Sequence, residues 1–395
     1  MKSEWRTVAL GSVADLTVGF VGTMASNYTE TGIPFLRSTN IEPFDIKLDD
    51  IKYISSNFNE SLRKSELHPN DVVIVRTGTP GACAVIPAGV KAWNCSDLVI
   101  VRPHRNKLNP LFLASYVNLA SGVINTQLVG AVQQHYNVGA AKKMQIPLPP
   151  IGEQDKIASI IGMLNKKITI NSKINDNLEQ QAQSYFQELF VDDADPEWTT
   201  GTISDLGAVV GGSTPSKAKP EYYTESGIAW ITPKDLSINK SKFVSHGEND
   251  ITELGLKNSS AAIMPEGTVL FSSRAPIGYI AIAAGEVTTN QGFKSVVPKP
   301  EIGTPFVYFF LKNTLPVIEG MASGSTFKEV SGSTMKNVPA VIPDAETLAK
   351  FSDFCAPIFA QQRILEEQNQ SLATLRDNLL PKLMSGEIDV SAVQL

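Results

Sequence analysis

The 395-residue sequence lacks the features that mark secreted, zinc-binding and membrane proteins. Its three cysteines, Cys83, Cys95 and Cys355, form no C-x-x-C pair, and its four histidines have no metal-ligand spacing. No run approaches the ~20 apolar residues of a membrane span, and the start MKSEWRTVALG lacks the apolar core of a signal peptide. We therefore expect a cytoplasmic chain with reduced thiols, no bound metal and no membrane contact.

Motifs for cofactors and catalysis are also missing. The sequence has no N-P-P-Y-like tetrapeptide and no glycine-rich strand-to-helix loop of the kind that binds S-adenosylmethionine. The turn Thr77–Gly81 has no lysine after its glycines, so it is not a P-loop, and a G-x-S-x-G elbow is absent. These absences favour a binding protein that is not an enzyme and uses no cofactor.

Basic residues are fewer than acidic residues in the whole chain, with 34 Lys and Arg against 40 Asp and Glu and a net charge of −6. Residues 1–150 nevertheless contain 14 Lys and Arg against 11 Asp and Glu. Residues 193–343 contain 12 against 15. Proteins that bind nucleic acid usually present a basic face. Charge alone therefore gives no support for DNA binding by the second of these segments.

An internal repeat is the main positive signal. Trp5 and Trp198 open similar runs, and GIPFLRSTNI (32–41) is echoed by GIAWITPKDL (227–236). DVVIVRTGTPG (71–81) is echoed in the same order by GTVLFSSRAPIG (267–278). Matches at a nearly constant offset predict two similar domains. Short β-rich runs and one helical stretch in each copy, Pro110–Ala120 and Pro305–Leu315, indicate mixed α/β domains rather than a doubly wound sheet.

A long helix is predicted after each copy. From Ile157, apolar and amide residues recur in steps of four and three through Asn171 and Asn175 to Leu189. The second seam runs from Phe351 through Gln361 and Gln368 to Leu379, with a kink or a new start expected at Pro357. Heptads of this length are typical of a coiled coil whose buried amides set the register, although each helix could instead lie on its own domain.

Together these patterns predict an α+β fold with a pseudo-two-fold internal repeat. Two similar mixed α/β domains, residues 1–150 and 193–343, are separated by two long antiparallel coiled-coil helices within 151–192 and 344–395. Two domains held apart by a rod suggest one ligand contacted at two places. Double-stranded DNA, whose groove repeats along its axis, is the obvious ligand of that form.

Candidate DNA-binding residues are those that can pair with purine edges or phosphates, in turns or at strand ends. Basic residues recur at near-equivalent repeat positions as Arg76/Arg274 and Arg37/Lys234. Each candidate taken alone could equally be plain surface, and Tyr222 could be core. The full set is Arg37, Asn40, Arg76, Gln133, Gln134, His135, Tyr136, Lys142 and Lys143 in the first copy, and Lys217, Lys219, Tyr222, Lys234, Arg274, Gln291 and Lys328 in the second.

The first long helix carries apolar residues outside its seam, at Ile160, Ile170, Ile174 and Phe186. A two-stranded coil needs only one apolar stripe, so these residues predict a further surface that binds a protein partner. The alternative is a wider stripe packed against the domains of the chain itself.

Two motifs resemble a known family. PLPPIGEQDKI (147–157) before the first helix and LLPKLMSGEI (379–388) near the C-terminus resemble the specificity subunits of type I restriction–modification systems. The resemblance implies two target-recognition domains, each reading one half of a bipartite DNA target. It also implies a non-catalytic subunit that scaffolds two methyltransferase subunits and, through them, the restriction subunits. The second helix lacks the Glu-Gln pair and has Glu346-Thr347, so the two docking sites could be unequal.

Two other functions are weighed against this one. A stand-alone DNA methyltransferase or nuclease is disfavoured by the missing motifs, and methyl transfer by the purified chain alone would restore it. A scaffold whose domains bind only protein would show no sequence-selective retention of DNA.

Overall fold

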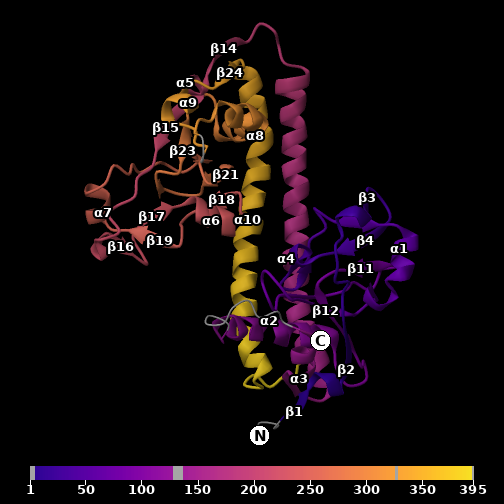
Figure 1. Cartoon of the computed structure of the whole chain (residues 1–395). Coiled ribbons are helices and arrows are strands. Elements are labelled where there is room, and N and C mark those ends of the chain that lie inside the picture. The colour runs from indigo at the N-terminus through magenta and orange to yellow at the C-terminus, as the bar shows by residue number, and fades with distance from the viewer. Residues whose placement is uncertain (1–4, 128–136, 325–327, 394–395) are drawn as a thin grey trace. The chain divides into compact units, whose positions relative to one another are not determined.

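The computed structural model describes residues 5–127, 137–324 and 328–393 (Figure 1). The chain divides into two compact units, which are described separately below. Unit 1 comprises Met1–Thr169 and Gln370–Leu395, and unit 2 comprises Ile170–Asn369. Each unit thus contains one copy of the repeat together with part of both long helices. The sequence predicts four segments, with each long helix separate from the two domains. Those domain boundaries stay a prediction.

Unit 1 is built on two sheets. An antiparallel sheet has the order β10 (Cys83–Val85), β9 (Val72–Val75), β12 (Leu98–Pro103), β2 (Ala14–Val18). A mixed sheet has the order β3 (Tyr28–Thr29), β7 (Lys52–Ile54), β4 (Ile33–Leu36), β11 (Trp93–Cys95), β8 (Glu66–Leu67). Two-stranded ribbons pair β1 (Arg6–Ala9) with β13 (Gln145–Leu148), and β5 (Ile41–Glu42) with β6 (Asp45–Ile46). The α-helices besides the two long ones are α1 (Ser56–Ser61), α2 (Pro110–Gln127) and α3 (Val138–Lys143).

Unit 2 repeats this plan. Its first sheet has the order β15 (Gly207–Gly211), β23 (Lys294–Pro298), β20 (Val269–Ser273), β21 (Ile277–Ala283), β18 (Phe243–Val244). Its second has the order β16 (Tyr223–Thr224), β19 (Asn249–Ile251), β17 (Ile228–Ile231), β22 (Thr288–Thr289). A ribbon joins β14 (Thr199–Thr202) to β24 (Pro339–Ile342). The shorter α-helices are α5 (Ile203–Leu206), α6 (Pro233–Ile238), α7 (Glu253–Lys257), α8 (Thr304–Met321) and α9 (Gly332–Lys336).

The continuous apolar runs of the sequence are strands buried on both faces. In β9, Val72 and Ile74 belong to the core beneath α2, whereas Val73 and Val75 belong to the core on the other face. Alternate side chains of a strand point to opposite faces, so a strand between two cores has no polar position. The predicted helical stretches are confirmed as α2 and α8, each of which covers one of these cores.

Equivalent glycines show that the repeat is structural. Gly81 follows β9 and Gly278 lies in β21, and both have φ +93°. A Cβ on Gly81 would lie 2.7 Å from Ser121 Cβ of α2, and one on Gly278 would lie 2.7 Å from Leu315 Cδ1 of α8. Only glycine combines this backbone conformation with so close an approach of strand to helix. Each copy therefore places its helix against the same turn.

The tryptophans that open the two copies are also equivalent. Trp5 Nε1 donates to Glu153 Oε2 in the first turn of α4 (Ile151–Gln187) at 3.1 Å. Trp198 Nε1 donates to Asp344 Oδ2, just before α10 (Ala345–Met384), at 2.9 Å. A carboxylate at a helix N-terminus is stabilised by the free N–H groups there. Each tryptophan therefore ties the start of its copy to the start of a long helix.

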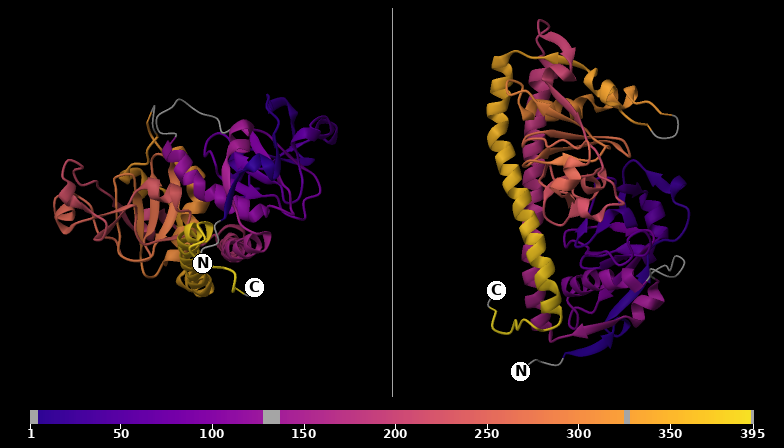
Figure 2. Two further views of the ribbon diagram at one scale, coloured as in Figure 1. Left: turned by 90° about the horizontal axis from the view of Figure 1, so that it is seen from below. Right: turned by 90° about the vertical axis from the view of Figure 1, so that its left-hand side faces the viewer.

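The two long helices run antiparallel within each unit (Figures 1 and 2). In unit 2, Asn171 Nδ2 lies 3.4 Å from Gln368 Oε1, and Gln362 Nε2 lies 3.2 Å from Asn175 O. In unit 1, Arg376 donates to Asn165 Oδ1 at 3.0 Å. The buried positions Ile157, Ile161, Asn171 and Ala182 confirm the predicted seam of α4.

The predicted seam of α10 is partly wrong. Phe351, Ile358 and Leu365 are buried as expected, but Gln361 is exposed and Gln362 is buried in its place. Phe354 and Leu375 are also exposed. The helix does not restart at Pro357, because buried residues on either side, Cys355 and Ile358, hold it against unit 2.

Within the described part of the chain, no helix is long and apolar enough to cross a membrane. The same residues contain no group of three or more His, Cys, Asp or Glu side chains that could hold a metal ion.

Candidate DNA interface

Strand register fixes which residues of the two copies correspond. Cys95 at the end of β11 pairs with Leu36, and Thr289 at the end of β22 pairs with Ile231. The next residues make the same hydrogen bond, since Ser96 N donates to Leu36 O and Asn290 N donates to Ile231 O, each at 3.0 Å. Ser96 therefore corresponds to Asn290. The residues that follow, Asp97 and Gln291, lie in loops of different length, since β12 begins at Leu98 whereas β23 begins at Lys294.

A third segment lines up in the same way. Phe20 N donates to Cys95 O at 2.8 Å, and Ser213 N donates to Thr289 O at 2.9 Å. The next residues, Val21 and Thr214, therefore correspond as well. The turn that contains Val21 therefore lies beside the end of β11, and the turn that contains Thr214 lies beside the end of β22.

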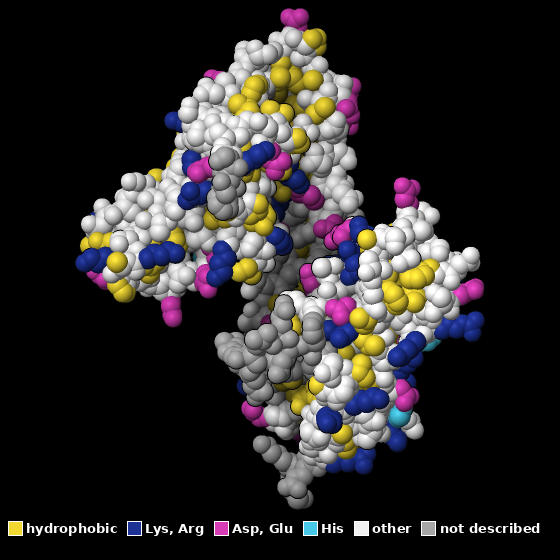
Figure 3. All heavy atoms as spheres, viewed as in Figure 1, with side chains coloured by type: hydrophobic (Ala, Val, Ile, Leu, Met, Phe, Trp, Pro, Cys, Tyr) yellow, Lys and Arg dark blue, Asp and Glu magenta, His cyan; other side chains and the backbone are white. Residues whose placement is uncertain are grey.

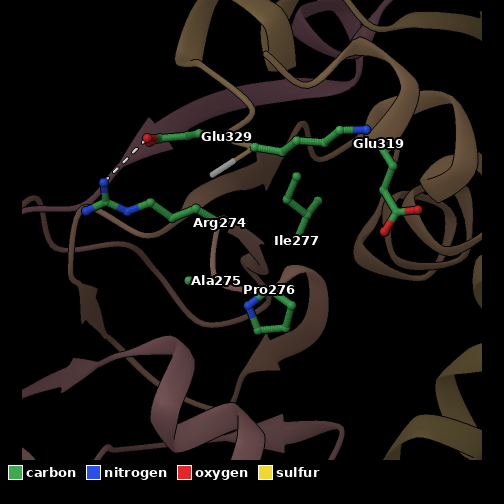
Figure 4. Close-up of a pocket in the computed structure, with 7 residues that line it drawn as sticks. Arg274, Ala275, Pro276, Ile277, Glu319 and Glu329 are labelled. Atoms are coloured by element: carbon green, nitrogen blue, oxygen red, sulfur yellow. Dashed lines mark hydrogen bonds and ion pairs between the residues drawn. The ribbon is translucent and has the colours of Figure 1, made fainter. Parts of the chain in front are cut away.

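Arg76 and Arg274 each follow the strand β9 or β20 directly, as the repeat predicts. Each is held by a carboxylate. Arg76 Nη1 lies 3.0 Å from Asp97 Oδ1, and only 16% of its side chain is exposed. Arg274 Nη1 lies 3.4 Å from Glu329 Oε2 with 37% of its side chain exposed (Figure 4). Arg274 is thus the more accessible of the two.

Two hollows in unit 2 meet at Arg274 and Ala275. One, of about 720 Å³, is lined by the exposed turn Ala275–Ile277 together with Glu319, Lys328 and Glu329 (Figure 4). The other, of about 480 Å³, is lined by five separate segments of the chain, those containing Thr214 and Lys217, Trp230 to Asp235, Glu248 and Asn249, Arg274 and Ala275, and Asn290 to Gly292. Strand ends from both sheets therefore converge here.

The structure brings most of the unit 2 candidates together. Lys217, Lys234, Arg274 and Gln291 line the smaller hollow, and Lys328 lines the larger. Lys234 is paired with Glu248 at 2.6 Å, which raises the pKa of Lys234.

Lys219 and Tyr222 line neither hollow. Lys219 lies 3.7 Å from Glu221, and Tyr222 is half-buried with its carbonyl accepting from Thr252 N at 3.0 Å. The neighbouring Tyr223 packs edge-on against Trp230. No contact of these residues points to a ligand.

In unit 1, Arg37 lies against Asp50. Its Nη2 donates to Asp50 Oδ2 at 2.7 Å and to Asp50 O at 2.6 Å. The hydrogen bond from Arg37, followed by that from Lys52, lowers the pKa of Asp50 to about 2. Arg37 is therefore held in the loop beside β7, with about a quarter of its side chain exposed.

Asn40 is not available to DNA, contrary to expectation. It is buried, its Oδ1 accepts from Arg37 N at 3.0 Å and its Nδ2 donates to Lys47 O at 3.0 Å. Asp235 makes the corresponding bond in unit 2, where its Oδ2 accepts from Thr232 N at 2.7 Å. A buried amide with both ends engaged closes a turn, and its remaining N–H is shielded from a base.

The same comparison corrects one predicted equivalence. Because Asn40 and Asp235 close the same turn, Arg37 corresponds to Thr232. Lys234 lies two positions further on. The basic residues Arg37 and Lys234 therefore do not share a repeat position. Arg76 and Arg274 are nearly equivalent, because the register of β9 and β20 places Arg76 at the position of Ser273, one residue before Arg274.

Two of the remaining unit 1 candidates, Lys142 and Lys143, lie on the helix α3. Lys142 and Lys143 form its last turn and are exposed, where lysine is favoured by the carbonyl groups of a helix end. Gln133, Gln134, His135 and Tyr136 lie outside the described residues.

Figure 3 shows Lys and Arg side chains interspersed with Asp and Glu on the visible surface of both units. Neither unit presents a continuous basic face in this view. On this face, contacts to an anionic ligand would therefore depend on a few local cations rather than on a broad charged surface.

The four predicted partner-binding residues of α4 differ in exposure. Ile170 and Ile174 are exposed at 42% and 39%. Ile160 is half-buried and packs against the unit 1 core. Phe186 is buried among Phe190, Phe306, Phe309 and Phe351, so its assignment to an exposed face is wrong. Helix periodicity could not reveal that α8 covers this end of α4.

Further exposed apolar residues lie on the long helices and were not predicted. Met163 on α4 and Ile364 and Leu375 on α10 are 52%, 47% and 46% exposed.

Comparison with known proteins places these features in context. The family model described as "Type I restriction modification DNA specificity domain" matches twice, at residues 2–180 and 196–375. The MjaIX specificity subunit of a Methanocaldococcus jannaschii type I restriction enzyme is 39% identical over 47% of this chain and 45% of its own length. The HindI specificity subunit of Haemophilus influenzae is 23% identical over 63% of this chain and 70% of its own.

A solved structure has a similar fold. The S subunit of a type I restriction–modification system from M. genitalium aligns with a TM-score of 0.60, at 16% identity, over 96% of each chain.

Proposed function

The chain belongs to the type I restriction modification DNA specificity family, and from this premise we propose that it is the sequence-specificity subunit of a type I restriction–modification enzyme. Its two repeat copies each read one half of a bipartite double-stranded DNA target. The observation that carries this proposal is the presence of two complete copies of the specificity domain in one chain. A chain that read a single continuous target would need only one copy of the domain.

The geometry of unit 2 supports direct contact with DNA. Cations and amides from several segments converge on one hollow, among them Lys217, Arg274 and Gln291. Arginine and amide side chains can pair with base edges in the major groove, and lysine with phosphates. Lys234 and Arg274 are each paired with a glutamate, so a phosphate or base would replace an existing partner rather than meet a bare cation.

We also propose a non-catalytic role for this chain inside a larger enzyme. Two methyltransferase subunits bind its long helices, and restriction subunits join through them. The exposed Ile170 and Ile174 supply apolar surface for the first of these contacts. Methyl transfer would then require the partner subunits, and the purified chain with S-adenosylmethionine alone should modify no DNA.

Sequencing of methylated bases in cells that express this chain with its methyltransferase subunit tests the proposal. We expect one bipartite motif with two defined halves separated by an unspecified gap. Cells expressing the methyltransferase subunit alone are the control and should lack the motif. Methylation of a continuous motif, or of the same motif without this chain, would contradict the proposal.

A further inference from the structure

The two copies place different side chains in the loops that follow the equivalent strands β11 and β22. The residue after the equivalent pair Ser96 and Asn290 is Asp97 in unit 1 and Gln291 in unit 2. Gln291 is exposed and Asp97 is half-buried, and both lie beside an arginine turn that follows the corresponding strand. The loops themselves also differ, since Asp97 has φ +53° and the loop of unit 2 is longer, so each copy presents its own side chain on its own backbone.

Gln291 has a fixed backbone and an amide with one free end. Gly292 N donates to Asn290 Oδ1 at 2.8 Å, and Lys294 Nζ donates to Gln291 O at 3.3 Å, which holds the turn. The Gln291 Oε1 atom accepts a hydrogen bond from the Thr214 hydroxyl. Among the described residues, Gln291 Nε2 has no partner. It offers two N–H donors at the edge of the 480 Å³ hollow.

Asp97 presents the opposite chemistry. Its Oδ1 lies 3.0 Å from Arg76 Nη1, and its Oδ2 accepts from the Thr77 hydroxyl at 2.5 Å. A carboxylate can only accept, and each oxygen keeps a further lone pair. With 40% of the side chain exposed, those lone pairs are open to a ligand.

Base edges in the major groove distinguish these two groups. Two free N–H donors best match guanine, whose N7 and O6 both accept, or thymine, whose O4 accepts, whereas adenine offers N7 beside its own N6 donor. A carboxylate matches the exocyclic amines of cytosine or adenine. Valine replaces the orienting hydroxyl in unit 1, since Val21 corresponds to Thr214. The donor orientation is therefore a property of unit 2 alone.

We propose that Gln291 and Asp97 are the specificity-determining residues at this point of the two half-targets, with Gln291 selecting guanine or thymine and Asp97 selecting cytosine or adenine. Thr214 is a positioning residue that turns the Gln291 amide. This inference rests on the proposed function, because it assumes that each copy reads a half-target.

The test is selection from a pool of random DNA duplexes by the full chain assembled with its methyltransferase subunit. Gln291→Glu keeps the side-chain size and replaces the donor with an acceptor. We expect one position of one half-target to change from guanine or thymine to cytosine or adenine. Affinity for the original target should fall about 5- to 150-fold. The other half-target should stay as it is.

Matched variants complete the test. Asn57→Asp makes the matching amide-to-carboxylate change at an exposed position of α1, away from the long helices, and should alter neither affinity nor motif. Asp97→Asn should change only the other half-target. Thr214→Val should relax the preference at the Gln291 position without reversing it, which a purely structural role for Thr214 would not do.

The outcomes separate the two proposals. A wild-type chain that selects a bipartite motif, together with a Gln291→Glu variant that selects the same motif equally well, overturns this inference and leaves the proposed function standing. A wild-type assembly that selects no motif overturns the proposed function itself. Because Gln291 is exposed, the variant should melt at the wild-type temperature, which circular dichroism checks.

Discussion

Lys242 Nζ lies 2.7 Å from Glu179 Oε2, which connects the segment entering β18 to the helix α4 inside unit 2. Gln362 of α10 accepts from the same ammonium at 2.8 Å, and the ring of Phe359 lies beneath it. Glu179 also pairs with Lys312 of α8. The repeat copy of unit 2 is therefore joined to both long helices through one half-buried carboxylate.

The charges in this cluster are mutually dependent. Burial would raise the pKa of Glu179, but Lys242 and Lys312 together lower it. Burial lowers the pKa of Lys242 to about 8, against the opposing effect of Glu179. Removing the carboxylate would leave two ammonium groups near each other without their shared counterion.

Glu179→Gln should destabilise the protein by about 3–5 kcal/mol, since breaking a buried ion pair leaves an uncompensated charge. Chemical denaturation measures the free energy of unfolding. Glu188→Gln, an exposed position immediately after α4, is the control and should change stability by less than about 0.5 kcal/mol. Equal effects of the two substitutions would show that the cluster contributes no stability.

The stabilisation by Glu179 should be lost at acid pH. Its folded-state pKa lies below the ordinary value of 4.5, so its contribution is complete above pH 4.5 and is lost as the pH falls through the folded value. The difference in unfolding free energy between wild type and Glu179→Gln should therefore shrink below pH 4.5. A difference that stays constant down to pH 3 would contradict the lowered pKa.

The contribution of Lys242 to stability should change at alkaline pH instead. Between about pH 8 and 10.5 the unfolded chain keeps a proton that folded Lys242 has released, so the residue's contribution to stability rises with pH. Relative to Lys242→Met, the wild type should gain stability across this window. Urea titrations at pH 8 and pH 10 would check this, and a wild-type loss over the same range would refute it.

Phe186→Ala should cost about 3–5 kcal/mol, because it removes a large side chain from a fully packed aromatic cluster. Ile174→Ala on the exposed face of the same helix should cost far less. Thermal melting of the two variants separates core from surface. A small effect at Phe186 would restore the interface assignment that its burial contradicts.

Ile174→Asp should weaken co-purification of the methyltransferase subunit while the chain stays folded. A charge placed in an apolar contact must be desolvated without a partner. The control is Ile238→Asp, the same substitution at a 70% exposed position on the short helix α6. Unchanged complex formation by Ile174→Asp would argue against this face of α4 as the docking surface.

Exchanging residues 1–150 for the equivalent domain of another family member should change one half-target and leave the other unaltered. The repeat gives each copy its own sheets, core and strand-end arginine, so each can read independently. Sequencing of methylated bases reports both halves. A change in both would show that the copies read DNA jointly.

Local patterns in the sequence were sufficient for the architecture. The repeat offset, the apolar strand runs and the heptads depend on neighbouring residues, and each matches an element of the structure, including α2, α8 and the seam of α4. The motifs around Pro147–Ile157 and Leu379–Ile388 were sufficient for the family.

Tertiary packing decided what side chains do. Asn40 and Arg37 look alike as polar residues after a strand, yet one closes a turn and the other pairs with Asp50. Phe186 and Ile174 both lie outside the heptad seam, but α8 covers only the first. Lys242 lies in a polar loop of the sequence and becomes buried because Glu179 and Gln362, far along the chain, meet it there. Burial and pairing depend on such distant partners, and no local spacing contains that information.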